Sequence, residues 1–157
     1  MRFVRHLVRS AVVALLAMFC VMPIGAISLA AIPPALAVEL SHAPESARAY
    51  LIAPKDGETV PSEFTVKFGL SGMGVAPAGF DKDGTGHHHL LIDVDELPSL
   101  TEPLAATSQI KHFGGGQTET TLNLEPGEHT LQLLLGNYSH VPHDNPVLSE
   151  QISITVK

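Results

Sequence analysis

The sequence predicts an all-β domain, an immunoglobulin-like β-sandwich of about seven strands that follows an N-terminal signal segment. Short apolar stretches with a period of two recur after residue 48, as expected for strands that bury one face. Clusters of Gly, Pro, Asn and Asp separate these stretches, and none of them has helical periodicity over a useful length. Many short strands divided by turns at frequent intervals are typical of a sandwich.

Residues 1–37 are expected to be a signal peptide. Arginines at positions 2, 5 and 9 precede a long apolar run, and Ala35-Leu36-Ala37 matches an A-x-A cleavage pattern. An uncleaved membrane anchor is the alternative, because the apolar run is long for a signal peptide, but Pro33-Pro34 disfavours one spanning helix. We therefore expect a mature chain from Val38, with a spacer over 38–48 and the sandwich over 49–157.

Removal of this segment leaves an acidic domain without cysteine. Cys20 is the only cysteine, so the mature chain has no disulfide or thiolate ligand. Six Lys and Arg would remain against sixteen Asp and Glu, a net charge of −10 with neutral histidines. That sign disfavours nucleic acid as a partner and favours metal cations. We expect a periplasmic or secreted protein that meets the membrane only if its signal segment stays uncleaved.

The β segments are assigned from alternation and turn residues. The range 64–70 alternates cleanly, with Phe64, Val66, Phe68 and Leu70 inward. Glu125-Pro126-Gly127-Glu128 is expected to be a tight hairpin turn, and the ranges 71–86 and 96–116 to be irregular loops. The expected strands are 49–53, 58–60, 64–70, 87–95, 117–124, 129–135 and 151–156.

Three adjacent histidines, His87-His88-His89, start the apolar strand at 87–95. With a period of two, His88 shares the core face with Leu90, Ile92 and Val94 and is expected to be buried and hydrogen-bonded. His87 and His89 then share the opposite face. Two imidazoles at positions i and i+2 of one strand face can bind a single metal ion.

Three further histidines in loops can join this pair. If 87–95 pairs antiparallel with 129–135, the start of the first strand lies beside Gly136 and the loop with His140 and His143. His129 would lie roughly 20 Å away and is excluded. His112 precedes Gly114-Gly115-Gly116, where a flexible loop could bring it to the same end. The expected metal ligands are His87, His89, His112, His140 and His143.

Imidazole ligands suit zinc, Cu(II) or nickel, and an exported, thiolate-free site leans toward Cu(II). The leading hypothesis is a copper or zinc carrier or buffer, with an envelope protein as a possible partner. In a second reading, the histidines only pin loops to the end of a non-catalytic module that binds the envelope. A metal-dependent enzyme is the third reading, although none of the serines beside histidine-containing loops lies in an elbow motif.

Other motifs are weaker. Met73 could be a Cu(I) ligand, but loop methionines more often plug a core. Asp81-Lys82-Asp83-Gly84 resembles the start of a calcium loop but lacks the required glutamate, since Ile92 occupies the twelfth position. Gly114-Gly115-Gly116 lacks the following lysine and helix of a phosphate site.

Several sequence blocks are similar to those of an exported bacterial family known as domain of unknown function 4399. The resemblance covers about residues 50–157 and implies no activity, because the family has none established. The blocks are Gly72–Gly79, Gly86–Asp93, His112–Thr120, Pro126–Gly136 and His140–His143.

Overall fold

The computed structural model describes residues 40–157, so the expected signal segment lies outside the described part. Residues 40–157 contain strands, turns and loops but no helix. Accordingly, this part of the chain contains no apolar helix of a length that could cross a membrane.

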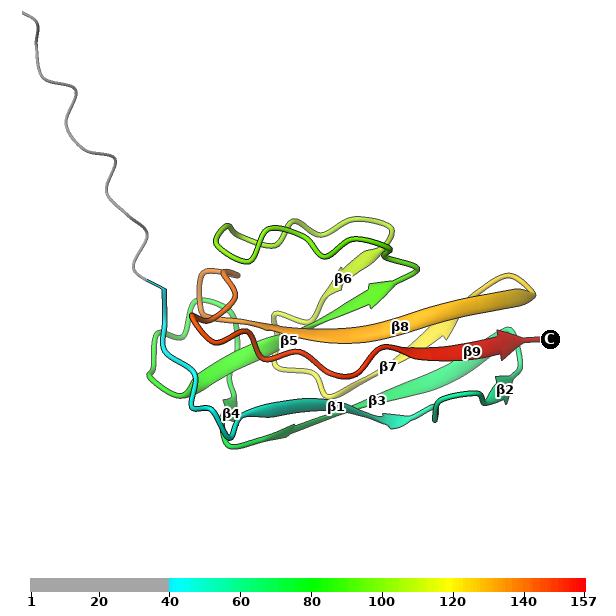
Figure 1. The fold of residues 1–157 in the computed structure, drawn as a ribbon, viewed down its shortest axis with the longest axis horizontal. Helices are drawn as coiled ribbons and strands as arrows, with labels where there is room; N and C mark the ends of the chain where they lie inside the picture. The colour runs from blue at the N-terminus through cyan, green and yellow to red at the C-terminus, as the bar shows by residue number, and fades with distance from the viewer. Residues whose placement is uncertain (1–39) are drawn as a thin grey trace, which may run out of the picture. The chain divides into compact units, whose positions relative to one another are not determined.

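The described strands form two sheets (Figure 1). One sheet has the order β1-β3-β7, and the other has the order β2-β9-β8-β5-β4, with β6 also paired to β5. The pairs β2–β9 and β4–β5 are parallel, and the others are antiparallel. The bounds are β1 Arg48–Ala53, β2 Thr59–Val60, β3 Glu63–Ser71, β4 Gly74–Val75, β5 Thr85–Ile92, β6 Ile110–His112, β7 Glu119–Asn123, β8 Gly127–Gly136 and β9 Ile152–Val156.

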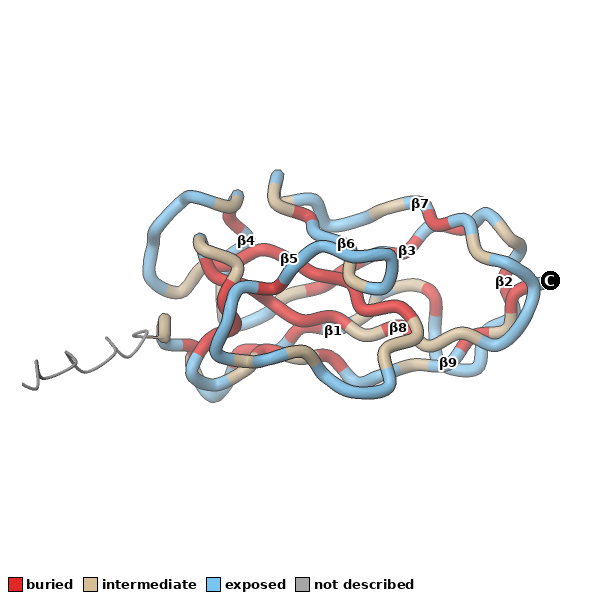
Figure 2. Tube along the Cα trace, turned by 90° about the horizontal axis from the view of Figure 1, so that it is seen from above, coloured by how far each residue is buried: buried red, intermediate tan, exposed pale blue. Residues whose placement is uncertain are grey.

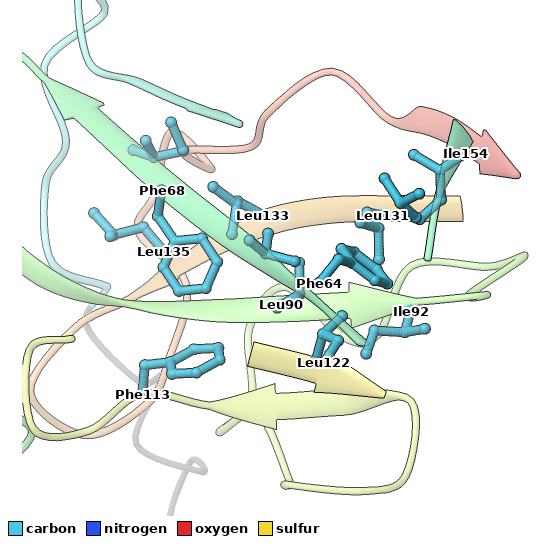
Figure 3. Packing of buried hydrophobic residues seen from close by; sticks show 14 of the residues in the cluster. Phe64, Phe68, Leu90, Ile92, Phe113, Leu122, Leu131, Leu133, Leu135 and Ile154 are labelled. Carbon is cyan, nitrogen blue, oxygen red and sulfur yellow. The ribbon is translucent and has the colours of Figure 1, made fainter. Parts of the chain in front are cut away.

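The core lies between the two sheets, as Figure 3 shows. The inward alternation predicted for β3 is confirmed for Phe64, Val66 and Phe68, which are all buried. They pack against Leu90 of β5 and Leu133 of β8 in the same cluster. Two mainly antiparallel sheets packed face to face make the domain an immunoglobulin-like β-sandwich, as the sequence predicts.

The expected hairpin at Glu125–Glu128 is wrong. The turn joins β7 to β8, but β7 pairs with β3 in one sheet, whereas β8 pairs with β5 and β9 in the other. The connection therefore crosses between the layers. β8 is apolar on both faces over Leu133–Leu135, and such a strand is stable as a covered central strand rather than as half of an exposed hairpin.

Two short strands occupy ranges expected to be irregular. β4 lies within 71–86 and β6 lies within 96–116. Both pair with β5, at Thr85–Gly86 and at His89–Leu91 respectively. Strands of two and three residues are too short to show a periodic pattern. β5 also ends at Ile92 rather than at residue 95, because Asp93 adopts a left-handed φ of 54°.

A second apolar cluster covers the outer face of β5 and β8. Leu91, Leu104 and Leu134 are buried there, and Leu104 comes from the long loop between β5 and β6. β5 is consequently covered on both faces, and Figure 2 shows it as a buried strand along most of its length. His87 and His89 share this face of β5 with Leu91, because side chains alternate along the strand.

The segment before β1 packs onto the sandwich, whereas a spacer was expected there. Ala43 and Ala47 belong to the main core. The backbone N–H of Ala43 donates to Asp144 Oδ1 at 3.0 Å, and Asp144 donates its own N–H to the carbonyl of Ser41. The ordered domain therefore includes residues before position 49.

Candidate metal centre

β5 divides the three adjacent histidines between its two faces, as the period of two predicts. His88 points into the main core, where its ring lies 5.3 Å from that of Phe68. His87 and His89 lie on the other face with ring centroids 4.9 Å apart. All three side chains are fully buried, so the face opposite the core is enclosed rather than open to solvent.

His112 reaches this face through strand pairing. It lies at the end of β6, directly opposite His89 in the antiparallel register. The His112 and His87 Nε2 atoms are 3.2 Å apart, and the His112 ring stacks on that of His89 at 5.1 Å. The expectation of a flexible loop at this position is therefore replaced by a fixed cross-strand pair. His112 is the solvent-exposed member of the group.

His140 reaches the same place through the loop after β8. The predicted antiparallel pairing of β5 with β8 is confirmed, with His87 opposite Gly136. The loop after β8 therefore begins beside the start of β5 (Figure 1). The His140 ring centroid lies 5.1 Å from that of His87, 4.6 Å from that of His112 and 6.2 Å from that of His89. We call His87, His89, His112 and His140 the histidine cluster.

The loop that carries His140 is closed by Asn137, a buried residue that the sequence analysis missed. Asn137 Oδ1 accepts hydrogen bonds from the N–H and hydroxyl of Ser139 and from the N–H of Val141. The Asn137 backbone carbonyl also accepts from the N–H of His140. His140 has a left-handed φ of 70°, a costly conformation for a residue with a Cβ. A strained residue held by a closed loop is typical of functional sites.

The fifth expected ligand, His143, has a different local environment. It is buried, and its Nε2–H donates to the carbonyl of Thr85 at 3.3 Å. Its ring is not among the ring pairs that connect the members of the histidine cluster in the described part of the chain. The structure thus brings four of the five expected ligands together and places His143 against the start of β5.

Several ring nitrogens of the cluster are buried without a partner among residues 40–157. They are His87 Nδ1 and both ring nitrogens of His89. A buried polar atom without a hydrogen bond is costly and needs an explanation, and a bound metal ion supplies one for an imidazole nitrogen. Nitrogens of His87, His89 and His112 also lie within 4.8 Å of one another.

Burial and mutual repulsion keep these imidazoles neutral. Burial, followed by the nearby rings of His112 and His140, lowers the pKa of His87 from 6.5 to about 4. Burial, followed by the charge of His87, lowers the pKa of His89 to about 3. Burial and the neighbouring His140 also lower the pKa of His112. A metal ligand must be a neutral imidazole, so His87 and His89 remain able to bind a metal ion well below neutral pH.

His88 departs from one expectation. It is buried on the core face, as predicted, but both of its ring nitrogens lack a hydrogen-bond partner among residues 40–157, so the expected hydrogen bond is absent there. Burial lowers its pKa to about 4. Its neighbour Phe68 offers a ring rather than a polar group. His88 therefore behaves as a neutral packing residue.

The remaining candidates lie apart from the cluster or are explained by packing. His129 donates from Nδ1 to Asp93 Oδ2 at 2.7 Å, and its Nε2 lies 2.9 Å from the Glu125 carbonyl. The hydrogen bond to Asp93, followed by the one to Glu125, raises the pKa of His129. Met73 is partly buried against the main core, which fits a packing role. His129 is not part of the group of side chains that could hold a metal ion among the described residues.

The fold and site together define a β-sandwich with an imidazole cluster on one covered face. A family model described as "Domain of unknown function (DUF4399)" matches residues 66–157, and the chain belongs to this family. All four members of the histidine cluster lie within the matched range. The comparison with curated proteins yields no match.

A structure titled as fibronectin(III)-like modules of CbhA from Clostridium thermocellum is similar to this chain, at 14% identity and a TM-score of 0.36. The match covers 74% of this chain and 46% of that one. The chain thus spans less than half the length of this neighbour.

Proposed function

We propose that the protein is an exported copper or zinc carrier or buffer that holds one ion in the histidine cluster. The observation that carries this proposal is the mutual contact of the four rings, whose six centroid distances run from 4.6 to 6.2 Å. The ring nitrogens of His87, His89 and His112 lie within 4.8 Å of one another, and the His140 ring adds a fourth imidazole beside them. A group of imidazoles suits zinc, Cu(II) or nickel. The signal-like start supports export to the periplasm or the exterior.

The unequal burial of the ligands supports a carrier over an enzyme. His87 and His89 are fully buried on β5, whereas His112 is exposed and His140 is half-buried. An ion held by two fixed inner ligands and two outer ligands can be exchanged from the solvent side. The group also lacks a carboxylate that could serve as general base. An envelope protein is the proposed recipient of the ion.

A hydrogen-bond network that pins loops is the second candidate. The 3.2 Å contact of His112 Nε2 with His87 Nε2 favours it, because one neutral ring can donate to the other. The hydrogen bond from His143 to Thr85 fits the same reading. His89 weighs against it, since a network built for loop attachment would not leave both nitrogens of a fully buried ring in the network unpaired.

The two candidates differ in their response to metal. Purified protein is stripped with a chelator and titrated with Cu(II) or Zn(II) while thermal unfolding is followed. At a hundredfold excess over the dissociation constant, binding should stabilise the fold by about 2.7 kcal/mol. The double variant His87→Ala/His89→Ala should lose this response. The matched control His42→Ala, an exposed histidine outside the cluster, should keep it. The carrier proposal fails if neither metal raises the unfolding temperature, or if the double variant responds like the wild type.

A further inference from the structure

Two glycines, Gly136 and Gly114, lie directly against rings of the histidine cluster. Gly136 ends β8, and a Cβ built on it would fall 2.8 Å from Cε1 and 3.2 Å from Nδ1 of His89. The same Cβ would lie 3.3 Å from the backbone of His140. A Cβ on Gly114 would fall 2.5 Å from Nε2 of His112. Real side chains do not tolerate such distances without movement.

The backbone does not explain why glycine stands at these two positions. Neither glycine is among the residues with a positive φ, whereas six other glycines of the described chain are. An alanine could adopt both conformations without backbone strain. The space that a Cβ would take is filled by imidazole instead, so the requirement at these positions comes from the rings.

We infer that Gly136 and Gly114 are positioning residues for metal binding, because each leaves room for one ligand ring beside the backbone. Gly136 admits the ring of His89 over the end of β8, and Gly114 admits the ring of His112 over the turn after β6. The expected effect of these glycines on metal affinity rests on the proposed metal site. The steric part of the inference, that each glycine makes room for a ring, concerns the metal-free protein and does not depend on that site.

The two positions differ in how the rings can respond to a methyl group. His112 is exposed, so its ring can turn out toward solvent when Gly114 becomes alanine. Gly114→Ala should weaken metal binding at least about tenfold with little change in the unfolding temperature of the metal-free protein. His89 is fully buried, so its ring has no free path away from Gly136. Gly136→Ala should weaken binding to a similar extent and also lower the unfolding temperature of the metal-free protein.

A double-mutant cycle tests the steric part without metal. In the metal-free wild type, Gly136→Ala should lower the unfolding midpoint. In the His89→Ala background, which lacks the ring, the same substitution should lower the midpoint much less. Gly74→Ala is the matched control, because a Cβ there would lie 3.6 Å from Thr85 Cγ2, an ordinary contact, and Gly74 has no positive φ. This control should leave both metal affinity and the unfolding midpoint close to wild type.

The outcomes separate this inference from the proposed function. If Gly114→Ala and Gly136→Ala both bind metal as tightly as the wild type, the inference is overturned and the proposed metal site stands. Equal costs of Gly136→Ala with and without the His89 ring would overturn the steric part. If the wild type binds no metal, the proposed function fails, and the metal-free cycle still decides whether Gly136 makes room for His89.

Discussion

The three adjacent histidines show how single residues in one short sequence acquire different roles. Their side chains alternate across β5, so His88 enters a core of aromatic and aliphatic groups, while His87 and His89 meet other imidazoles. All three are equally buried. Burial alone therefore does not distinguish a ligand from a packing residue, and the neighbours of each ring do.

We expect substitutions of these histidines to separate metal binding from stability. His87→Ala or His89→Ala should weaken metal affinity at least about tenfold, because each removes one of the four proposed ligands. His88→Ala should leave affinity nearly unchanged but cost the metal-free protein about 2 kcal/mol, since it opens a cavity beside Phe68.

His88→Leu provides the control for this comparison. Leucine fills a similar volume and removes two buried nitrogens that lack partners, so its effect on stability should be close to neutral or favourable. Calorimetric metal titration and urea unfolding measure the two quantities. The role of His88 as a packing residue would be contradicted if His88→Leu abolished metal binding.

The residue roles that could be predicted from the sequence are those set by a regular pattern. The period of two assigns the faces of His87, His88 and His89, and strand arithmetic places His140 near them. Asn137 and Gly136 could not be recognised as supporting residues. Their roles depend on the closed conformation of one loop and on a ring that packs over a strand end, and neither leaves a periodic signal.

At the scale of elements, the cluster is assembled from three separate segments that meet at β5. β5 provides two histidines, β6 provides His112 by direct pairing, and the loop after β8 provides His140. The three-residue β6 is expected to be the weakest of these attachments, because it forms few ladder hydrogen bonds. A bound ion would tie all three segments together.

The closed loop after β8 gives a test at this scale. Asn137→Ala removes the acceptor for three donors, so the loop should lose the conformation that places His140. Metal affinity should fall by roughly 10- to 100-fold, as is typical when the groups that orient a ligand are lost. The exposed Asn145 offers the matched control Asn145→Ala, with affinity near wild type. Equal affinities for the two variants, measured by competition with a chelator, would show that Asn137 does not position His140.

The positions of the main strands could be predicted from the sequence, but the pairing between strands could be predicted only in part. Clean alternation identified β3, and the long apolar run identified β8, but the sheet change between β7 and β8 was missed. A Pro-Gly turn fits a hairpin and a layer crossing equally well at the level of local sequence. β4 and β6 escaped prediction because pairing with β5, rather than their own sequence, makes them strands.

For the whole molecule, the buried histidines link stability to pH. The pKa values of His87 and His88 are lowered to about 4 and that of His89 to about 3, against about 6.5 in the unfolded chain. At pH values between the folded-state and the unfolded-state pKa, the unfolded state binds more protons than the folded state. The metal-free protein should therefore keep its full stability above pH 6.5 and lose it progressively as the pH falls toward 4. A shift of this size is worth about 3 kcal/mol for one fully buried histidine.

His129 contributes in the opposite direction, because its pKa is raised in the folded state. Its protonated form stabilises the folded state below pH 6.5, and this stabilisation is lost as the pH rises. It is a single group on a partly exposed strand, so the three buried histidines should dominate. Urea unfolding of the metal-free protein between pH 7.5 and 4.5 measures the balance. His88→Leu should make the slope shallower. A stability that is flat or rises as the pH falls would contradict the neutral, buried state assigned to these rings.

X-ray absorption of the metal-loaded protein measures whether four imidazoles bind one ion. The protein is loaded with one equivalent of Zn(II) or Cu(II) and exchanged into metal-free buffer before measurement. For zinc, binding by four imidazoles predicts one retained ion with four nitrogen ligands at ~2.0–2.1 Å and the multiple scattering of imidazole rings. Loss of the ion on buffer exchange, or a ligand shell of oxygen atoms without imidazole scattering, would contradict it.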